Sequence, residues 1–195
     1  MIRIARGPEP EELRRERRRR LARAYLAFLG GRPVDFDGYQ CAKKLLYERQ
    51  HRKCAYCERH TGFGSQPVEH FRPKDGAWRN LPRTPCVLEE DYYWWLAWTW
   101  ENLLFSCSPC NGRDNKGNHF PLEDGTHPLP LPPRAESLAL PAECFDLSRE
   151  SPRLVDPARE DPMEHIRWLP INAGVGVPEE KLAWALLLQV VRKLA

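Results

Sequence analysis

Two Cys-x-x-Cys pairs constrain this chain more than any other feature of its sequence. The first pair is Cys54 and Cys57, and the second is Cys107 and Cys110. Two residues between the cysteines let both thiolates of a pair reach one ion at about 2.3 Å, and two such pairs complete a tetrahedral shell of four sulfur ligands. We therefore predict a structural Zn²⁺ site that joins two distant segments of the chain.

The composition is that of a soluble globular protein. Of the 195 residues, 42% are hydrophobic and 29% are charged, which is ordinary for a packed domain. No run reaches the roughly 18 apolar residues of a membrane helix, and no signal-peptide core follows Met1, so we expect a cytoplasmic protein without a membrane partner. In that reducing compartment the three remaining cysteines are expected to be ordinary buried residues rather than disulfides: Cys41, Cys86 and Cys144.

We predict three segments along the chain. Residues 1–52 form an N-terminal helical segment, and residues 53–120 form a unit that holds both cysteine pairs. Residues 121–195 begin with a proline-rich connector, which cannot be helical, and continue into a C-terminal helical segment. Within that last segment a largely apolar pattern predicts a helix over 179–195.

The N-terminal segment carries the main concentration of positive charge. Two helices are predicted there, over 9–29 and 38–51. Six of the seven residues from Arg14 to Arg20 are arginine, although the net charge of the whole chain is only +3. This block either neutralises nucleic-acid phosphates or forms the polar face of an amphipathic helix, and both interpretations stay open.

A dense group of aromatic residues precedes the second cysteine pair. Spacings of three and four residues predict a helix packed into the core, and stacking on unpaired bases is the alternative. The group consists of Tyr92, Tyr93, Trp94, Trp95, Trp98 and Trp100.

Residues suited to phosphodiester chemistry lie around the cysteine pairs. Glu69 and His70 are adjacent, Asn102 precedes the second pair, and Asn111 follows it directly. This order resembles the HNH endonuclease family, in which an acid–histidine pair on a strand is followed by a loop asparagine and then by an Asn or His on a closing helix. The resemblance implies an α+β fold: a ββα-metal (HNH) catalytic unit with a four-Cys zinc site, embedded in additional mostly helical segments.

The residues within these motifs are similar to those of a narrower branch, the HNH nuclease subunit of Septu-type antiphage systems, including retron-associated versions. That resemblance implies DNA as the substrate, with RNA still open, and an ABC/SMC-like ATPase as the partner protein. It does not extend over residues 171–195. The motifs that carry it are Cys54-Ala55-Tyr56-Cys57-Glu58, Val68-Glu69-His70-Phe71-Arg72-Pro73-Lys74, Trp100-Glu101-Asn102-Leu103-Leu104 and Lys116-Gly117-Asn118-His119-Phe120.

The chemistry assigns a role to each candidate. Histidine, with an ordinary pKa of about 6.5, suits the removal of a proton from water, so His70 is the expected general base. Neighbouring side chains on a strand point to opposite faces, so Glu69 shares a site with His70 only where the backbone bends. The resemblance implies that Glu69 and Asn111 hold a catalytic Mg²⁺ or Mn²⁺ and that Asn102 tethers the loop and orients the base.

Two choices are less constrained by the sequence. Asn115 and His119 are alternatives to Asn111 as the third motif residue, because several candidates lie within nine residues. Three basic residues are expected to contact nucleic-acid phosphates: Arg72, Lys74 and Lys116.

Two other functions compete with a DNA endonuclease. One is a non-catalytic zinc-binding module that docks nucleic acid or protein through the Arg14–Arg20 face, and the other is an HNH-type RNase. The combination of Glu69, His70 and the two asparagines favours catalysis, since a docking module has no need of it. The sequence has no Gly-x-x-x-x-Gly-Lys-Ser/Thr loop, so we expect any ATP-dependent control to come from another protein.

Overall fold

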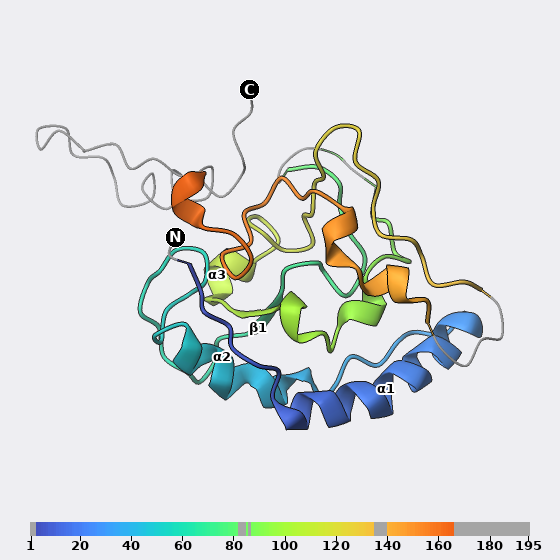
Figure 1. Cartoon of the computed structure of the whole chain (residues 1–195), viewed down its shortest axis with the longest axis horizontal. Coiled ribbons are helices and arrows are strands. Elements are labelled where there is room, and N and C mark those ends of the chain that lie inside the picture. Colours follow the sequence, from blue (N-terminus) through green and yellow to red (C-terminus); the bar gives the residue numbers. More distant parts are fainter. Residues whose placement is uncertain (1–2, 82–84, 86, 135–139, 166–195) are drawn as a thin grey trace, which may run out of the picture.

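Two helices lie along one side of the molecule, and the central part of the described chain packs over them (Figure 1). The computed structural model describes residues 3–81, 85, 87–134 and 140–165. Helix α1 (Glu11–Leu29) has two acidic residues in its first turn, where they favour the positive end of the helix dipole. A 3₁₀ turn, η1 (Tyr39–Ala42), leads into α2 (Lys43–Arg49). Both N-terminal helices are thus confirmed, the second with a tighter first turn than expected.

The arginine block covers about two turns of α1, and its side chains are exposed or partly exposed. Glu9 and Glu16 each form ion pairs with two of its arginines. These pairs offset part of the positive charge, so the structure favours the amphipathic-helix interpretation of the block. The buried residues of α1 are Leu13, Ala24, Tyr25 and Phe28.

A small antiparallel sheet occupies the centre of the chain. Strand β1 (Val68–His70) pairs with β2 (Leu103–Phe105), and helix α3 (Ser108–Asn111) follows directly. The side-chain amide of Gln50 closes the free edge of β2, because it donates to the Phe105 carbonyl at 2.7 Å and accepts from the Phe105 N–H at 2.8 Å. This mixture of helices and a two-stranded sheet confirms the α+β class.

The aromatic group belongs to the core, as predicted, but the predicted helix is wrong. Its residues lie in two separate 3₁₀ turns, η2 (Trp94–Leu96) and η3 (Trp100–Asn102). Tyr93 has a left-handed φ of 66° and Thr99 is extended, so a continuous helix is impossible there.

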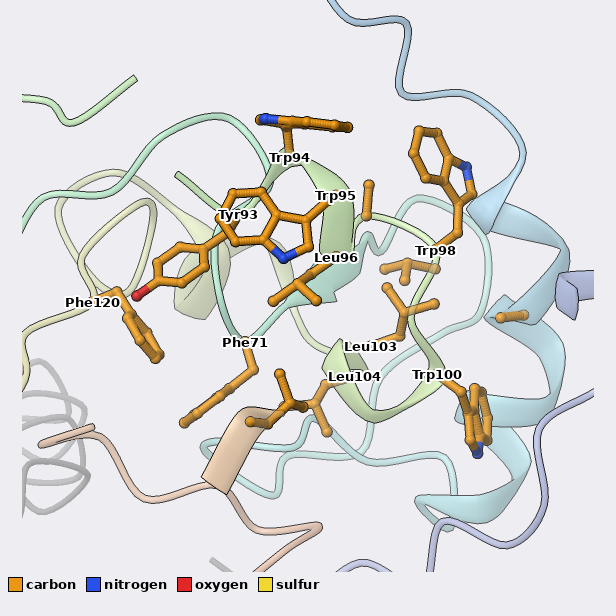
Figure 2. Packing of buried hydrophobic residues seen from close by; sticks show 14 of the residues in the cluster. Phe71, Tyr93, Trp94, Trp95, Leu96, Trp98, Trp100, Leu103, Leu104 and Phe120 are labelled. Carbon is orange, nitrogen blue, oxygen red and sulfur yellow. The ribbon is translucent and has the colours of Figure 1, made fainter. Parts of the chain in front are cut away.

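Three indoles of this group point in different directions (Figure 2). Each donates its N–H to a backbone carbonyl in a different segment, which the shared face of one helix would not allow. The group therefore ties the N-terminus, the turn before α2 and the C-terminal connector into one core. The bonds run from Trp95 to Cys144 (2.7 Å), from Trp98 to Asp37 (2.7 Å) and from Trp100 to Gly7 (3.0 Å).

The predicted boundaries at residues 52 and 120 do not separate cores. One hydrophobic cluster extends from Leu13 to Val155. The connector contributes three 3₁₀ turns to the described structure: η4 (Ala142–Phe145), η5 (Leu147–Arg149) and η6 (Pro162–Glu164).

A buried ion pair fastens the connector to the sheet. Arg72, just after β1, donates Nε to Glu150, and their side chains are 1% and 0% exposed. The second oxygen of Glu150 accepts from the Tyr93 hydroxyl at 2.8 Å and the Leu129 N–H at 3.0 Å. Both carboxylate oxygens of Glu150 therefore have hydrogen-bond partners inside the protein.

Several expectations concern other parts of the chain. The helix predicted over 179–195 and Cys86 lie outside the described residues. Cys144 is buried, as expected, and Cys41 is half-buried. In the described part of the chain, no helix combines the length and apolar character needed to cross a bilayer.

Replacing Glu150 by glutamine tests the buried pair. The substitution leaves the Arg72 guanidinium without a counter-charge, so we expect the free energy of unfolding to fall by about 3–5 kcal/mol. Urea unfolding followed by tryptophan fluorescence measures this change. The double variant Arg72→Met with Glu150→Met removes both charges and should recover most of the loss; equal midpoints for wild type and Glu150→Gln would contradict the role of the pair.

Candidate metal centre and catalytic site

The two cysteine pairs meet in one cluster. All four Sγ atoms lie within 4.8 Å of one another. Those of Cys57 and Cys107 are 3.8 Å apart, too far for a disulfide and close to the roughly 3.8 Å between sulfur atoms of a tetrahedral shell with 2.3 Å zinc bonds. The four cysteines are therefore close enough to hold a zinc ion, and no His, Asp or Glu is needed to complete the shell.

Each cysteine pair, with the two residues between its cysteines, forms a knuckle that is hydrogen-bonded to or continuous with a neighbouring element. In the first knuckle the Ala55 N–H donates to the Phe105 carbonyl at the end of β2. The second opens α3, where the Cys107 carbonyl accepts the Asn111 N–H at 3.1 Å. A zinc ion that joins the knuckles thus fixes both β2 and the helix that follows it.

His70 is held in one protonation state and one tautomer. Its Nε2 lies 2.9 Å from the Ala97 carbonyl, which can only accept, so Nε2 carries the proton and Nδ1 keeps its lone pair. Burial lowers the pKa of His70 to about 3, and the Tyr39 ring packs edge-on against the imidazole with centroids 4.5 Å apart. At neutral pH His70 is an uncharged base whose Nδ1 has no hydrogen-bond partner among the described residues.

Glu69 lies on the other side of β1 from His70, as strand alternation requires. Its Oε1 accepts from the Tyr56 hydroxyl at 3.2 Å and lies 2.8 Å from the Lys116 ammonium. The Lys116 ammonium also donates to the His70 carbonyl at 2.7 Å. Burial raises the pKa of Glu69 and lowers the pKa of Lys116, while each charge opposes the shift of the other.

The side-chain amide of Asn102 hydrogen-bonds to both backbone groups of Arg72, just after β1. Its Oδ1 accepts the Arg72 N–H at 2.7 Å and its Nδ2 donates to the Arg72 carbonyl at 2.9 Å. Asn102 is fully buried. These bonds suit a residue that tethers the segment after His70 rather than one that touches substrate.

The three candidates for the third motif position differ in what their side chains already bind. Asn115 donates Nδ2 to the Pro109 carbonyl at 2.7 Å, and His119 donates Nδ1 to the Asn80 carbonyl at 2.9 Å. Asn111 is half-buried, and within the described structure its amide makes no hydrogen bond. The bonds of Asn115 and His119 leave Oδ1 of Asn115 and Nε2 of His119 unengaged as well, so all three stay candidates for the third motif position.

The three predicted phosphate contacts are placed very differently. Arg72 is 1% exposed and Lys116 is 5% exposed, because each neutralises a buried carboxylate, Glu150 and Glu69 respectively. A direct phosphate contact by Arg72 does not fit this burial. Lys74 is partly exposed and influences the pKa of His70, so its predicted contact with substrate is compatible with its position.

Four residues that build the site were not singled out from the sequence. Of these, Tyr56 carried a signal, since it lies between the cysteines of the first pair. The others come from outside the motifs, and nothing in the sequence links them to the site. They are Gln50, which hydrogen-bonds to β2, Tyr39, which packs against His70, and Glu150, which pairs with Arg72.

Comparison with known proteins identifies relatives. The Septu protein PtuB of Bacillus mycoides (strain KBAB4) is 34% identical over 136 residues, which cover 68% of this chain and 41% of the relative. The chain is homologous to the Septu protein PtuB. A second PtuB, from Bacillus thuringiensis, is 38% identical over 79 residues, covering 40% of this chain and 24% of that protein. The predicted relationship to Septu proteins is thus confirmed.

These matches have a limited reach. The chain spans less than half the length of either PtuB relative that it matches. No family model matches the chain, and no solved structure matches it either.

Removal of the metal tests the four-cysteine cluster. We expect about one zinc per chain in the purified protein and almost none in Cys107→Ser, measured by elemental analysis. Since zinc would join the knuckles on both sides of β2, the variant should also unfold at a temperature at least several degrees lower. Cys144→Ser is the control and should keep its zinc; a Cys107→Ser protein with wild-type zinc content would contradict the site.

The buried neutral imidazole predicts a pH dependence of stability. Its pKa is about 3 in the folded chain against 6.5 when unfolded, so protons bind the unfolded state preferentially and stability falls as the pH drops below 6.5. Between pH 7.5 and 5.5 we expect wild type to lose about 1 kcal/mol more than His70→Gln. Urea unfolding with zinc content checked at each pH measures this, and parallel pH curves would show that His70 is not held neutral.

Proposed function

We propose that the chain is a metal-dependent HNH-type endonuclease that hydrolyses phosphodiester bonds of DNA in antiphage defence. The observation that carries the proposal is His70, buried and neutral at the end of β1, with its Nε2 proton held by Ala97 and its Nδ1 unpaired among the described residues. The Nδ1 lone pair is available at neutral pH, but burial lowers the pKa of His70 to about 3, so the attacking water would have to be made more acidic by a bound metal ion.

The order of the elements supports this assignment. Strands β1 and β2 pair antiparallel with His70 opposite Leu103, and α3 follows β2 through the second cysteine pair. The general base, the tether Asn102 and the half-buried Asn111 then come from β1, the turn before β2 and α3 respectively. This order of strand, strand and helix is compatible with the proposed ββα-metal unit.

The residues around His70 suggest how the proton is moved. Nδ1 takes a proton from the attacking water, and the resulting imidazolium is stabilised because Nε2–H points at the Ala97 carbonyl. Tyr39 limits rotation of the ring from one side. Lys74, whose ammonium lies 4.7 Å from the Phe36 ring, is placed to contact phosphate near the base.

Glu69 and Asn111 would hold the catalytic Mg²⁺ or Mn²⁺. Carboxylate and amide oxygens suit these hard cations. The Glu69 carboxylate is paired with Lys116 on the side of β1 away from His70, so this assignment rests on the resemblance to HNH nucleases and requires the end of β1 to bend when metal binds. A bound divalent ion would supply positive charge to the phosphate and to the leaving oxygen.

The biological setting rests on the relatives. Homology to Septu proteins supports a component of a multi-protein antiphage system. An ABC/SMC-like ATPase is the proposed partner, as the resemblance to Septu nuclease subunits implies. The given sequence has no Gly-x-x-x-x-Gly-Lys-Ser/Thr loop, so any ATP-dependent control is assigned to that partner.

Cleavage of supercoiled plasmid with Mg²⁺ or Mn²⁺, alone and with a Septu ATPase, tests the proposal. We expect the wild type to nick or linearise DNA and His70→Ala to be slower by about 10²-fold or more, since it lacks the base. The exposed His60→Ala is the matched control and should cleave normally, with zinc content equal in all three proteins.

Other outcomes separate the alternatives. Cleavage of RNA but not DNA, lost in the same variant, would identify an RNase. If no nucleic acid is cleaved with or without the ATPase while zinc is present, the docking-module hypothesis replaces catalysis.

A further inference from the structure

The first knuckle belongs to a short hairpin formed by residues 52–61. The Thr61 N–H donates to the Arg52 carbonyl at 3.2 Å, and the Cys54 N–H donates to the Arg59 carbonyl at 3.0 Å. The hairpin follows α2 almost directly. It therefore holds Arg52 and Arg59 on opposite arms, and both residues are exposed.

This hairpin and α2 together carry a concentration of positive charge. Residues 43–59 contain six basic and two acidic residues, a net charge of +4, whereas the whole chain carries +3. A zinc ion with four thiolates, at a net charge of about −2, would still leave the region positive. The six basic residues are Lys43, Lys44, Arg49, Arg52, Lys53 and Arg59.

These cations have no acidic partner in the protein, in contrast to those of α1. Five of the seven arginines of α1 form ion pairs with nearby carboxylates. Among the described residues, none of the six basic residues of 43–59 forms an ion pair. An unpaired, solvated cation attracts a polyanion more strongly than a neutralised one does, so the region around the hairpin is the better phosphate-binding surface.

The backbone at Arg52 does not favour a long side chain. Its φ is 62°, in the left-handed region where glycine and asparagine are preferred. A strained conformation of this kind is often found at a functional position. Because neither local backbone preference nor an internal ion pair accounts for the arginine, its guanidinium is suited to a contact outside the chain.

The basic region begins next to the proposed general base. Tyr39, which packs edge-on against His70, lies in the turn that leads into α2. Lys43 follows it by about one helical turn. The Lys43 ammonium lies 4.8 Å from the centroid of the Phe63 ring and donates to the Gly64 carbonyl at 2.7 Å. Phe63 is 44% exposed, so this part of the surface is open to a large ligand.

We propose that the exposed cations of α2 and of the hairpin bind the phosphate backbone of DNA and hold the duplex beside His70. The inference rests on the proposed function, in which DNA is the substrate. Duplex DNA carries one negative charge for about every 1.7 Å of its axis, which complements a surface of unpaired cations. Docking is thereby assigned to Lys44, Arg52 and Arg59, called here the knuckle surface, and not to the more conspicuous arginine block of α1.

DNA binding by the full chain tests this assignment. Anisotropy of a labelled duplex is measured without added Mg²⁺ or Mn²⁺, which cleavage requires. For the triple variant Lys44→Gln, Arg52→Gln and Arg59→Gln we expect Kd to rise by about tenfold or more at about 0.1 M salt. The slope of log K against log salt concentration should become shallower by about 2–3, since three phosphate contacts are lost.

A second triple variant is the matched control. Arg14→Gln, Arg15→Gln and Arg19→Gln remove the same charge from ion-paired positions of α1, so this protein should bind DNA nearly as tightly as the wild type. Zinc content and the thermal midpoint show that each variant is folded. Unchanged binding by the knuckle-surface variant, or equal weakening in both variants, would overturn the inference.

Arginine labelling of the wild type locates the contact without any substitution. The protein is treated with an arginine-specific dicarbonyl reagent, with and without saturating DNA, and each site is quantified by mass spectrometry. We expect DNA to slow the labelling of Arg52 and Arg59 severalfold and to leave that of Arg15, whose side chain is 76% exposed, unchanged. Equal labelling of Arg52 and Arg59 in both samples would contradict the inference, also if the triple variant does not fold.

Plasmid cleavage by the same proteins separates this inference from the proposed function. If the wild type cleaves DNA and the knuckle-surface variant binds and cleaves equally well, only the docking assignment is wrong. If the wild type binds DNA through these residues but cleaves no nucleic acid, the proposed catalysis fails and the docking surface stands. Binding of RNA but not DNA would overturn both.

Discussion

The structure depends on the convergence of four sulfur atoms from two distant knuckles. The first knuckle bonds to the end of β2 through the Ala55 N–H, and the second begins α3. Strands of three residues are too short to be stable alone. A zinc ion held by the four thiolates would supply the cross-link that such a sheet needs. It would also fix the surroundings of Glu69, because Tyr56 and Lys116 belong to segments attached to the same cysteine pairs.

Buried charge is the second organising constraint. Three carboxylates, Glu69, Glu150 and Asp156, are buried among the described residues, and each is paired with one basic residue: Lys116, Arg72 and Arg6 respectively. Buried ions are tolerated only with a partner of opposite charge and further hydrogen bonds. This rule explains why Arg72 is buried against Glu150, although its place in the motif suggested a surface contact. It also ties the connector, which lay outside the predicted catalytic unit, to the strand that carries His70.

The site shows where prediction from sequence works. The cysteine spacing predicted a cluster, and the structure gathers all four Sγ atoms. The rule of strand alternation predicted that Glu69 and His70 point to opposite sides, and their contacts agree. The aromatic group was expected in the core but not as two 3₁₀ turns, because spacings of three and four residues fit several backbone paths. Only the separate carbonyl partners of the indoles distinguish these paths.

The sequence by itself determined the chemistry that is present: four thiols at metal-binding spacing, an acid beside a histidine, and asparagines in order, together with the kinship to Septu proteins. These features depend only on residues close together in the chain, so the sequence alone is enough to recognise them. The tertiary structure alone decided which charges are paired and which nitrogen is free. His70 is neutral because burial disfavours its charged form more than the hydrogen bond to the Ala97 carbonyl favours it. Lys116 faces Glu69 because the turn after α3 brings its ammonium to the carboxylate. Such contacts depend on burial and on segments far apart in the chain, and no local pattern encodes them.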